Sequence, residues 1–214
     1  IVMGVIPGGS GNDFYKMLGN NGRPENGFKT AFFGAPHEVD VGLVNERSFF
    51  NTVGIGFDAD VALRANLSTG MPGILGYLVA VFQSWRNLEP VELEMKLDKY
   101  KFTAKVTLVC IGNGRSSGGG FYLTPQARFD DGLFDICLIE AMPRSKIITY
   151  LPRTLNGSHI RLPGVKMYRS RKIVISSHQK FPVHIDGDSL AAAIDLAEFT
   201  MESKKLKVAV AEKI

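Results

Sequence analysis

Cysteine is scarce in this sequence, with two residues among 214, and neither has a second cysteine at metal-binding spacing. Cys110 and Cys137 each lie inside an apolar run, where a free cysteine is usually a small buried side chain. The scarcity therefore excludes a cysteine-based zinc site. We expect two reduced thiols in the core of a cytoplasmic protein.

Long apolar runs are missing as well. The longest uncharged stretch, residues 65–85, contains a proline and three glycines, and its apolar part, residues 74–82, is too short to span a bilayer. The first residues also carry no basic region of the kind that opens a signal peptide. We expect a protein that is soluble or attached only peripherally to a membrane surface.

Acidic residues are absent between Arg144 and Lys180. The basic residues of that block are Arg144, Lys146, Arg153, Arg161, Lys166, Arg169, Arg171, Lys172 and Lys180. Such a block suits an anionic partner, such as a phosphate-bearing ligand or an acidic membrane, and an ordinary solvated face explains it equally well. We expect no nucleic-acid partner, because the block lacks the interleaved aromatic side chains that stack on bases.

What is present indicates a folded α+β protein. With 45% hydrophobic and 21% charged residues, the chain can bury one large core or two small ones. Residues 1–6 resemble a short strand, and a glycine-rich turn then leads into a helix that begins near residue 12. From residue 36 onward short strand patterns dominate, with helices expected only at residues 74–87 and 145–156.

One strand pattern is especially regular. Val91, Leu93, Met95 and Leu97 alternate with charged residues and share one face. The Asp98-Lys99 connection to the next apolar run predicts a hairpin. We therefore expect the remnant of an α/β nucleotide-binding unit in residues 1–36, a mainly antiparallel β-sandwich in residues 37–198, and a terminal strand in residues 199–214 that can return to the first unit.

The turn "PGGSGND", residues 7–13, has the form of an anion site. A glycine-rich turn before a helix presents several N–H donors beside the positive end of the helix dipole. Ser10 and Asp13 fit a capping box, and Asn12 and Asp13 can address a ribose, a magnesium ion or a phosphate-bound water. The segment is neither a Walker loop nor a Rossmann fingerprint. A tight structural turn explains the same residues.

Two further segments place carboxylates in turns. "FDDGLFD" offers Asp130, Asp131 and Asp135 to a hard cation such as magnesium, although a polar hairpin turn has the same composition. "VHIDGD" ends a strand with Asp186 and Asp188, and a carboxylate there can act as a general base if it meets a hydroxyl. A plain turn is again the alternative.

The remaining candidates carry little chemistry by sequence. The segment at residues 49–61, with Asn51, Asp58 and Asp60, is interpreted as mostly structural. The histidines at positions 37, 159, 178 and 184 show no spacing that suggests a catalytic triad or a metal site, so we expect surface or satisfied core residues.

Taken in order, "GVIPGGSGNDF", "VDVGLVN", "FFNTVGIGFDADV", "GNGRSSGGGFYLTPQARFDDGLFDICLIE" and "VHIDGD" resemble the diacylglycerol kinase-like lipid kinase family. This family includes the bacterial diacylglycerol kinases, the YegS/BmrU-type lipid kinases and the sphingosine kinases. The resemblance runs from residue 4 to about residue 210, and residues 112–140 are its most specific part. It implies an α/β nucleotide-binding domain, a β-sandwich and an active site between them.

The resemblance also implies a reaction and a set of residues. ATP would phosphorylate a lipid hydroxyl, most simply that of diacylglycerol, with Mg²⁺ assisting. Asp186 would be the general base, beside Asp188, which stands where the family usually has glutamate. The nucleotide site would comprise Gly9, Ser10, Gly11, Asn12, Asp13 and Asp40. A structural Mg²⁺ would be held by the side chain of Asp131 and by the main-chain carbonyls of Arg128 and Leu133.

The printed sequence differs from the family pattern in one respect. In the family a G-G-D-G-T loop that holds ATP phosphates precedes the opening strand, and the printed sequence starts after that point. We therefore expect these 214 residues alone to be inactive. A non-catalytic lipid-binding or regulatory module and, less favoured, a nicotinamide-nucleotide kinase are the alternatives. The implied partners are ATP, a lipid substrate and an anionic membrane surface, and a homodimer is left open.

Overall fold

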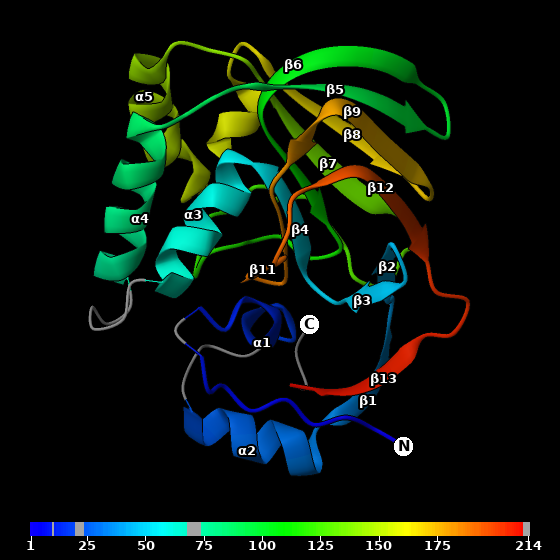
Figure 1. The fold of residues 1–214 in the computed structure, drawn as a ribbon. Helices are drawn as coiled ribbons and strands as arrows, with labels where there is room; N and C mark the ends of the chain where they lie inside the picture. Colours follow the sequence, from blue (N-terminus) through cyan, green and yellow to red (C-terminus); the bar gives the residue numbers. More distant parts are fainter. Residues whose placement is uncertain (10, 20–23, 68–73, 212–214) are drawn as a thin grey trace.

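A computed structural model describes residues 1–9, 11–19, 24–67 and 74–211, and within them it has the expected α+β class (Figure 1). The elements in chain order are α1 (Asp13–Met17), α2 (Pro24–Phe33), β1 (Ala35–Val39), β2 (Gly42–Val44), β3 (Arg47–Phe49), β4 (Thr52–Gly56), α3 (Phe57–Leu67), α4 (Ile74–Arg86), β5 (Val91–Leu97), β6 (Lys101–Gly112), β7 (Phe134–Glu140), α5 (Arg144–Thr154), a 3-10 turn η1 (Ser158–Arg161), β8 (Val165–Ser170), β9 (Ile173–Phe181), β10 (Val183–Ile185), β11 (Asp188–Ser189), β12 (Ile194–Met201) and β13 (Leu206–Val210).

Strand β6 is the branch point of an eleven-stranded sheet. Its first half pairs with β5, its second half with β4, and its other edge with β7. From these neighbours the sheet continues through β10 and β11, through β9, β12, β2 and β3, and through β8. The strand pairs are antiparallel, as the sequence predicts. The curved sheet encloses a core of aliphatic and phenylalanine side chains, among them Phe49, Phe134, Phe181 and Phe199.

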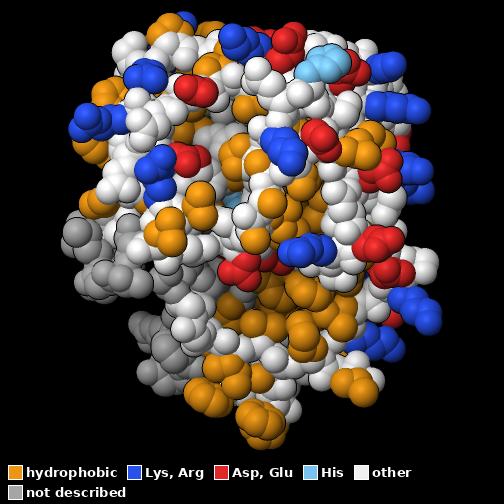
Figure 2. Space-filling model, in the orientation of Figure 1, with side chains coloured by type: hydrophobic (Ala, Val, Ile, Leu, Met, Phe, Trp, Pro, Cys, Tyr) orange, Lys and Arg blue, Asp and Glu red, His pale blue; other side chains and the backbone are white. Residues whose placement is uncertain are grey.

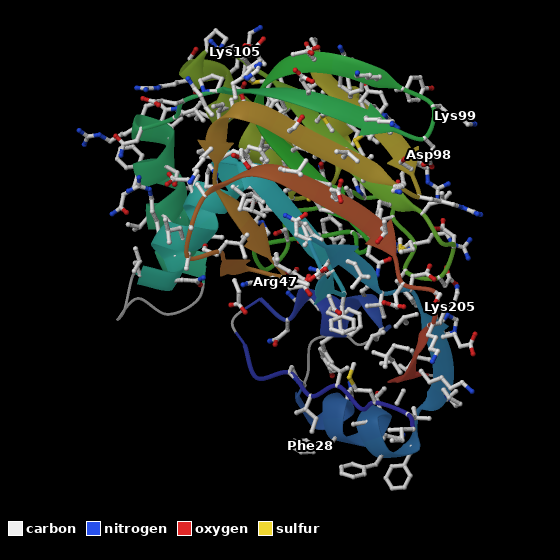
Figure 3. All side chains as sticks on the ribbon, turned by 45° about the vertical axis from the view of Figure 1, so that its right-hand side comes forward. Phe28, Arg47, Asp98, Lys99, Lys105 and Lys205 are labelled. Carbon is white, nitrogen blue, oxygen red and sulfur yellow. The ribbon has the colours of Figure 1, made fainter. Side chains whose placement is uncertain are left out.

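The predicted hairpin of β5 and β6 is confirmed. Burial alternates along β5, with Leu93, Met95 and Leu97 inside. The turn closes where the Leu97 N–H donates to the Tyr100 carbonyl at 2.8 Å. Its tip, with Asp98 and Lys99, lies at one end of the sheet (Figure 3), where Asp98 accepts the Arg171 N–H at 2.7 Å.

Helices α3, α4 and α5 cover the outer face of the sheet around β6 and β7 (Figure 1). The predicted helices at residues 74–87 and 145–156 correspond to α4 and α5. Helix α3, whose buried residues are Phe57, Asp58, Ala59 and Val61, was not predicted from the sequence. Gly56, with φ 78°, makes the abrupt change from β4 to α3 that a side chain would hinder.

The first and last parts of the chain lie together. Strands β1 and β13 form a separate two-stranded sheet, and Met3 adds a single parallel bridge to Val208. The strand predicted at residues 1–6 is therefore reduced to that bridge. Helix α2, also not predicted, lies beneath this sheet and exposes Phe28, Phe32 and Phe33 (Figures 1 and 3). Among the described helices, none is long and apolar enough to cross a membrane.

Candidate active site

A cleft of about 670 Å³ separates the N-terminal elements from the sheet. Most of the residues predicted for the ATP site and for catalysis line it together: Gly9, Gly11, Asn12, Asp13, Asp186 and Asp188. Ser10 lies outside the described residues. The remaining predicted residues, Asp40, Arg128, Asp131 and Leu133, are not among the cleft lining. The molecule therefore places the predicted site residues in two locations.

The glycine-rich turn is closed by Asn12. The Gly9 N–H donates to the Asn12 side-chain oxygen at 3.0 Å, and the Asn12 amide donates back to the Gly9 carbonyl at 2.6 Å. Asn12 is also the residue that caps α1, in a left-handed conformation with φ 52° and without a side-chain cap hydrogen bond. In the part of the turn that is described, the Asn12 side chain therefore holds the turn at the wall of the cleft.

Asp13 links the N-terminal turn to the sheet. One carboxylate oxygen accepts the Ser116 hydroxyl at 2.8 Å, and the other accepts the Gly119 N–H at 2.7 Å. A side chain at Gly11 would begin only 3.2 Å from the Gly119 nitrogen, so glycine permits this close approach. These two hydrogen bonds of Asp13 hold the N-terminal turn against the loop that follows β6.

Asp186 is held by a nest of three backbone amides. Its Oδ2 accepts the Phe50 N–H at 2.8 Å, while its Oδ1 accepts the N–H groups of Asn51 and Thr52, each at 2.9 Å. Burial raises the pKa of the Asp186 carboxyl, and the three amides partly offset that rise. A carboxylate has about four acceptor positions, so one remains, on Oδ2. Asp186 reaches this position from a left-handed turn, with φ 50°.

A buried histidine–aspartate pair lies beside that turn. His184 Nε2 is 2.9 Å from Asp58 Oδ2, and their side chains are 1% and 6% exposed. The Gly187 N–H approaches His184 Nδ1 at 3.3 Å, so we assign the proton to Nε2, which donates to Asp58. His184 is thus a satisfied core histidine, one of the two outcomes expected from the sequence, and Asp58 is its buried partner.

Gly54 in the middle of β4 is the sequence signal for this pair. A Cβ atom there would lie 2.2 Å from His184 Nε2 and 2.4 Å from Asp58 Oδ2. A glycine inside a strand often marks such a close approach. The partners themselves are 126 positions apart, so local spacing could not reveal them.

The other predicted residues gather around the segment 128–133, which we call the acidic loop. Asp131 forms an ion pair with Arg169 Nη2, and its Oδ1 accepts the Leu133 N–H at 3.2 Å. Asp40 pairs with Lys205 at 2.8 Å. Asp131, the side-chain ligand that the resemblance implies for magnesium, is therefore already paired with a cation in this arrangement, and its role as a metal ligand stays a prediction.

A small apolar pocket of about 50 Å³ opens beside the cleft. It lies between α3, α4, α5 and the sheet, and its lining includes Val61, Val81, Leu108 and Leu151. Asp58 lines both this pocket and the cleft. The polar cleft and the apolar pocket thus share one buried carboxylate in their walls. Figure 2 shows that hydrophobic side chains also reach the surface between acidic and basic ones on that face of the molecule.

Comparison with known proteins identifies this arrangement. Residues 51–210 match the YegS C-terminal NAD kinase beta sandwich-like domain, and residues 1–44 match the diacylglycerol kinase catalytic domain. This chain belongs to the diacylglycerol kinase and YegS-like lipid kinase family. The boundary between the two matches falls just before Asn51, in the segment whose amides hold Asp186.

Curated relatives support the assignment. A diacylglycerol kinase of Mycobacterium tuberculosis is 31% identical over 88% of this chain and 63% of its own length. A probable YegS-like lipid kinase of Pseudomonas putida is 29% identical over 89% of this chain and 63% of its own length. The chain thus spans about three fifths of the relatives' length. A solved diacylglycerol kinase structure from Bacillus anthracis, at 19% identity, shares the fold with a TM-score of 0.69 over 99% of this chain and 67% of that one.

Proposed function

We propose that the full polypeptide is an ATP-dependent lipid kinase that phosphorylates a hydroxyl group of a diacylglycerol-like lipid, with Asp186 as the general base. The observation that carries this proposal is the position of Asp186. It lines the same cleft as Gly9 and Gly11, it is oriented by three backbone amides, and one acceptor position of Oδ2 stays open. Family membership supplies the reaction class.

The chemistry of the chain's own residues follows from that geometry. ATP, as its magnesium complex, supplies the phosphoryl group. Asp186 Oδ2 takes the proton of the lipid hydroxyl, and the amides of Phe50, Asn51 and Thr52 keep the carboxylate from turning away. Because burial raises the pKa of Asp186, its carboxylate is a stronger base than an exposed aspartate.

The glycine-rich turn supports nucleotide binding in the same cleft. Gly9 and Gly11 allow the backbone to approach phosphate groups closely, and they face the wall that carries Asp186 and Asp188. Asp13 binds Ser116 and the Gly119 amide, so its role is to hold the turn against the loop that follows β6. Asp188 adds negative charge at the edge where the hydroxyl must enter.

The apolar pocket suits the acyl part of the substrate. It shares the lining residue Asp58 with the cleft, so a lipid with its hydroxyl near Asp186 would have the apolar space between α3 and α5 close by. The pocket holds only about 50 Å³, and α3 or α5 must therefore move slightly to admit a chain. Glycerol-based lipids with a primary hydroxyl fit this division of polar and apolar space.

Helices α4 and α5 provide the surface that would meet a membrane. Neither contains an acidic residue, and both contribute to the apolar pocket. Leu78 and Phe82 on α4 and Ile148 on α5 are exposed, and basic side chains flank them. The basic block of the sequence, residues 144–180, contributes two kinds of side chain. Lys166 and Arg169 on β8 pair with carboxylates, whereas α5 carries the basic residues at the start of the block. We therefore assign membrane attraction to α5, whose basic residues are Arg144, Lys146 and Arg153.

A phosphate-transfer assay tests the proposal. The full polypeptide is incubated with ATP labelled at the γ-phosphate and, separately, with mixed micelles of diacylglycerol, a sphingoid base, phosphatidylglycerol or a polyprenol, and with NAD. Label on a lipid supports the proposal and names the substrate. Label on NAD alone would make the protein a nicotinamide-nucleotide kinase. No transfer to any acceptor, with no ATP binding, would indicate a lipid-binding module instead.

A further inference from the structure

Four aspartate side chains lie in the acidic loop or next to it. Asp130 and Asp131 belong to the loop, Asp135 follows it in β7, and Asp40 approaches it from the end of β1. Four like charges this close would repel one another strongly if they were not compensated. Something positive must therefore hold the loop closed.

Arg169 provides the first part of that compensation. Strand register places Arg169 directly opposite Asp135 in the β7–β8 pair. Its Nε lies 3.3 Å from Asp135 Oδ2, and its Nη2 bonds Asp131 Oδ2. The guanidinium thus bridges the strand to the loop, in the planar two-point manner that suits arginine and not a spherical ion.

The burial of Asp135 makes the loss of this bridge costly to stability. The Asp135 side chain is only 3% exposed, and Arg169 is its ion-pair partner. Removing Arg169 would leave a buried carboxylate without its cation, which is far more costly than losing a surface ion pair. Asp131 is less buried, with 21% of its side chain exposed, and it is where water or a metal ion could compete.

Lys205 provides the second part. Its ammonium group lies 2.8 Å from Asp40 Oδ1 and donates to the Asp130 carbonyl at 2.8 Å. Asp40 Oδ2 accepts the Gly132 N–H at 2.7 Å. The lysine enters from the start of β13, at the opposite edge of the loop (Figure 3). Both ends of the loop are thus tied to side-chain cations.

We propose that Arg169, assisted by Lys205, replaces a structural divalent cation, so that the acidic loop is closed without bound magnesium. Arg169 pairs with Asp131 Oδ2 while Oδ1 accepts the Leu133 amide, so a guanidinium already supplies the positive charge beside this carboxylate. The inference does not depend on the kinase proposal, because it concerns stability and not phosphate transfer.

Thermal unfolding of the full polypeptide without nucleotide tests this inference. The melting temperature is measured in magnesium and in EDTA for the wild type, Arg169→Gln and Lys166→Gln. Lys166 is the matched control, since it also lies on β8 and pairs with a β7 carboxylate, Glu140, at 2.5 Å. We expect no magnesium response in the wild type or in Lys166→Gln. Arg169→Gln should melt several degrees lower in EDTA and regain part of the loss in magnesium.

Direct magnesium titration keeps the inference testable if Arg169→Gln fails to fold. Calorimetry on the nucleotide-free wild type should then detect no saturable site, and Arg169→Lys should fold with reduced stability because it cannot bridge two carboxylates. The inference is overturned if the wild type binds magnesium saturably, melts higher in its presence, and loses both properties on Asp131→Asn.

Discussion

His184 donates to Asp58 across 2.9 Å in a site where both side chains are almost fully buried, two residues before Asp186. The Gly187 N–H meets the other nitrogen of the same imidazole. Two sets of contacts therefore hold the turn that carries Asp186. The His184–Asp58 pair binds the Gly187 N–H, and the amides of residues 50–52 bind the Asp186 carboxylate. A general base needs such support, because small errors in its position reduce catalysis strongly.

The space that Gly54 leaves for this pair can be tested directly. Gly54→Ala should lower the free energy of unfolding by about 1–3 kcal/mol or more, since the new methyl group would overlap both His184 and Asp58. Gly8→Ala is the control, because a side chain there would meet nothing within 4 Å. Denaturant unfolding measures both. Equal stability of the two variants would show that the pair does not occupy this space.

The hydrogen bond itself calls for a separate comparison. Asp58→Ala should destabilise the protein by about 1–3 kcal/mol, because the Nε2 proton of His184 would be left buried without an acceptor. Asp58→Asn keeps a carbonyl oxygen at that position and should retain most of the stability. The melting temperatures of the two variants decide the matter: if both fall equally, the charge of Asp58 and not its acceptor stabilises the turn.

Stability at acidic pH should report on Asp98 at the tip of the β5–β6 hairpin. The pKa of Asp98 is lowered, and the largest cause is the hydrogen bond from the Arg171 N–H. Desolvation raises this pKa in part, while hydrogen bonds with Ser170 and from the Lys172 N–H lower it further. Because the pKa of Asp98 is lower in the folded than in the unfolded protein, its carboxylate stabilises the fold at pH values above the unfolded pKa of about 3.9. This stabilisation is lost as the pH falls through the folded pKa.

Asp98→Asn should therefore cost less than about 1 kcal/mol at pH 7, because the site is exposed and screened by solvent. The difference from wild type should disappear as the medium is acidified. Urea unfolding between pH 7 and pH 2 measures this. A gap that widens toward low pH would contradict the assignment.

Membrane attraction through α5 predicts a charge effect. Lys146→Glu combined with Arg153→Glu should reduce binding to vesicles that contain anionic lipid, by roughly tenfold or more if each residue contributes about 1 kcal/mol. Lys99→Glu with Lys101→Glu, at the far hairpin, is the matched control and should bind normally (Figure 3). Vesicle sedimentation at low salt gives the comparison. If both pairs reduce binding equally, attraction is diffuse and α5 is not the contact surface.

Local patterns explain what could be predicted from the sequence. The β5–β6 hairpin follows from alternation and a tight turn, and α4 and α5 follow from apolar runs with few breaks. Motif order led to the family and to Asp186. The cleft then brings Asp186 and Asp188 together with Gly9, Gly11 and Asn12, although their roles in binding and catalysis stay predictions.

Interactions between distant residues explain what could not be predicted. The His184–Asp58 pair and the Lys205–Asp40 pair each depend on tertiary contact across more than a hundred positions. The register of β7 and β8, which sets Arg169 opposite Asp135, is likewise not visible in either strand alone. Of the predicted capping box, Ser10 lies outside the described residues, and Asp13 binds Ser116 and Gly119 in the neighbouring loop.

The central claim, that Asp186 is the base of a lipid kinase, is tested most directly by labelled phosphate transfer from ATP to diacylglycerol by the full polypeptide, its Asp186→Asn variant and its Asp195→Asn variant. Asparagine still offers a carbonyl oxygen to the amides of Asn51 and Thr52 but cannot take a proton. We predict a loss of about 10²–10⁴-fold for Asp186→Asn. The exposed Asp195 on β12 should be dispensable. Transfer that persists at the wild-type rate in folded Asp186→Asn would contradict the account.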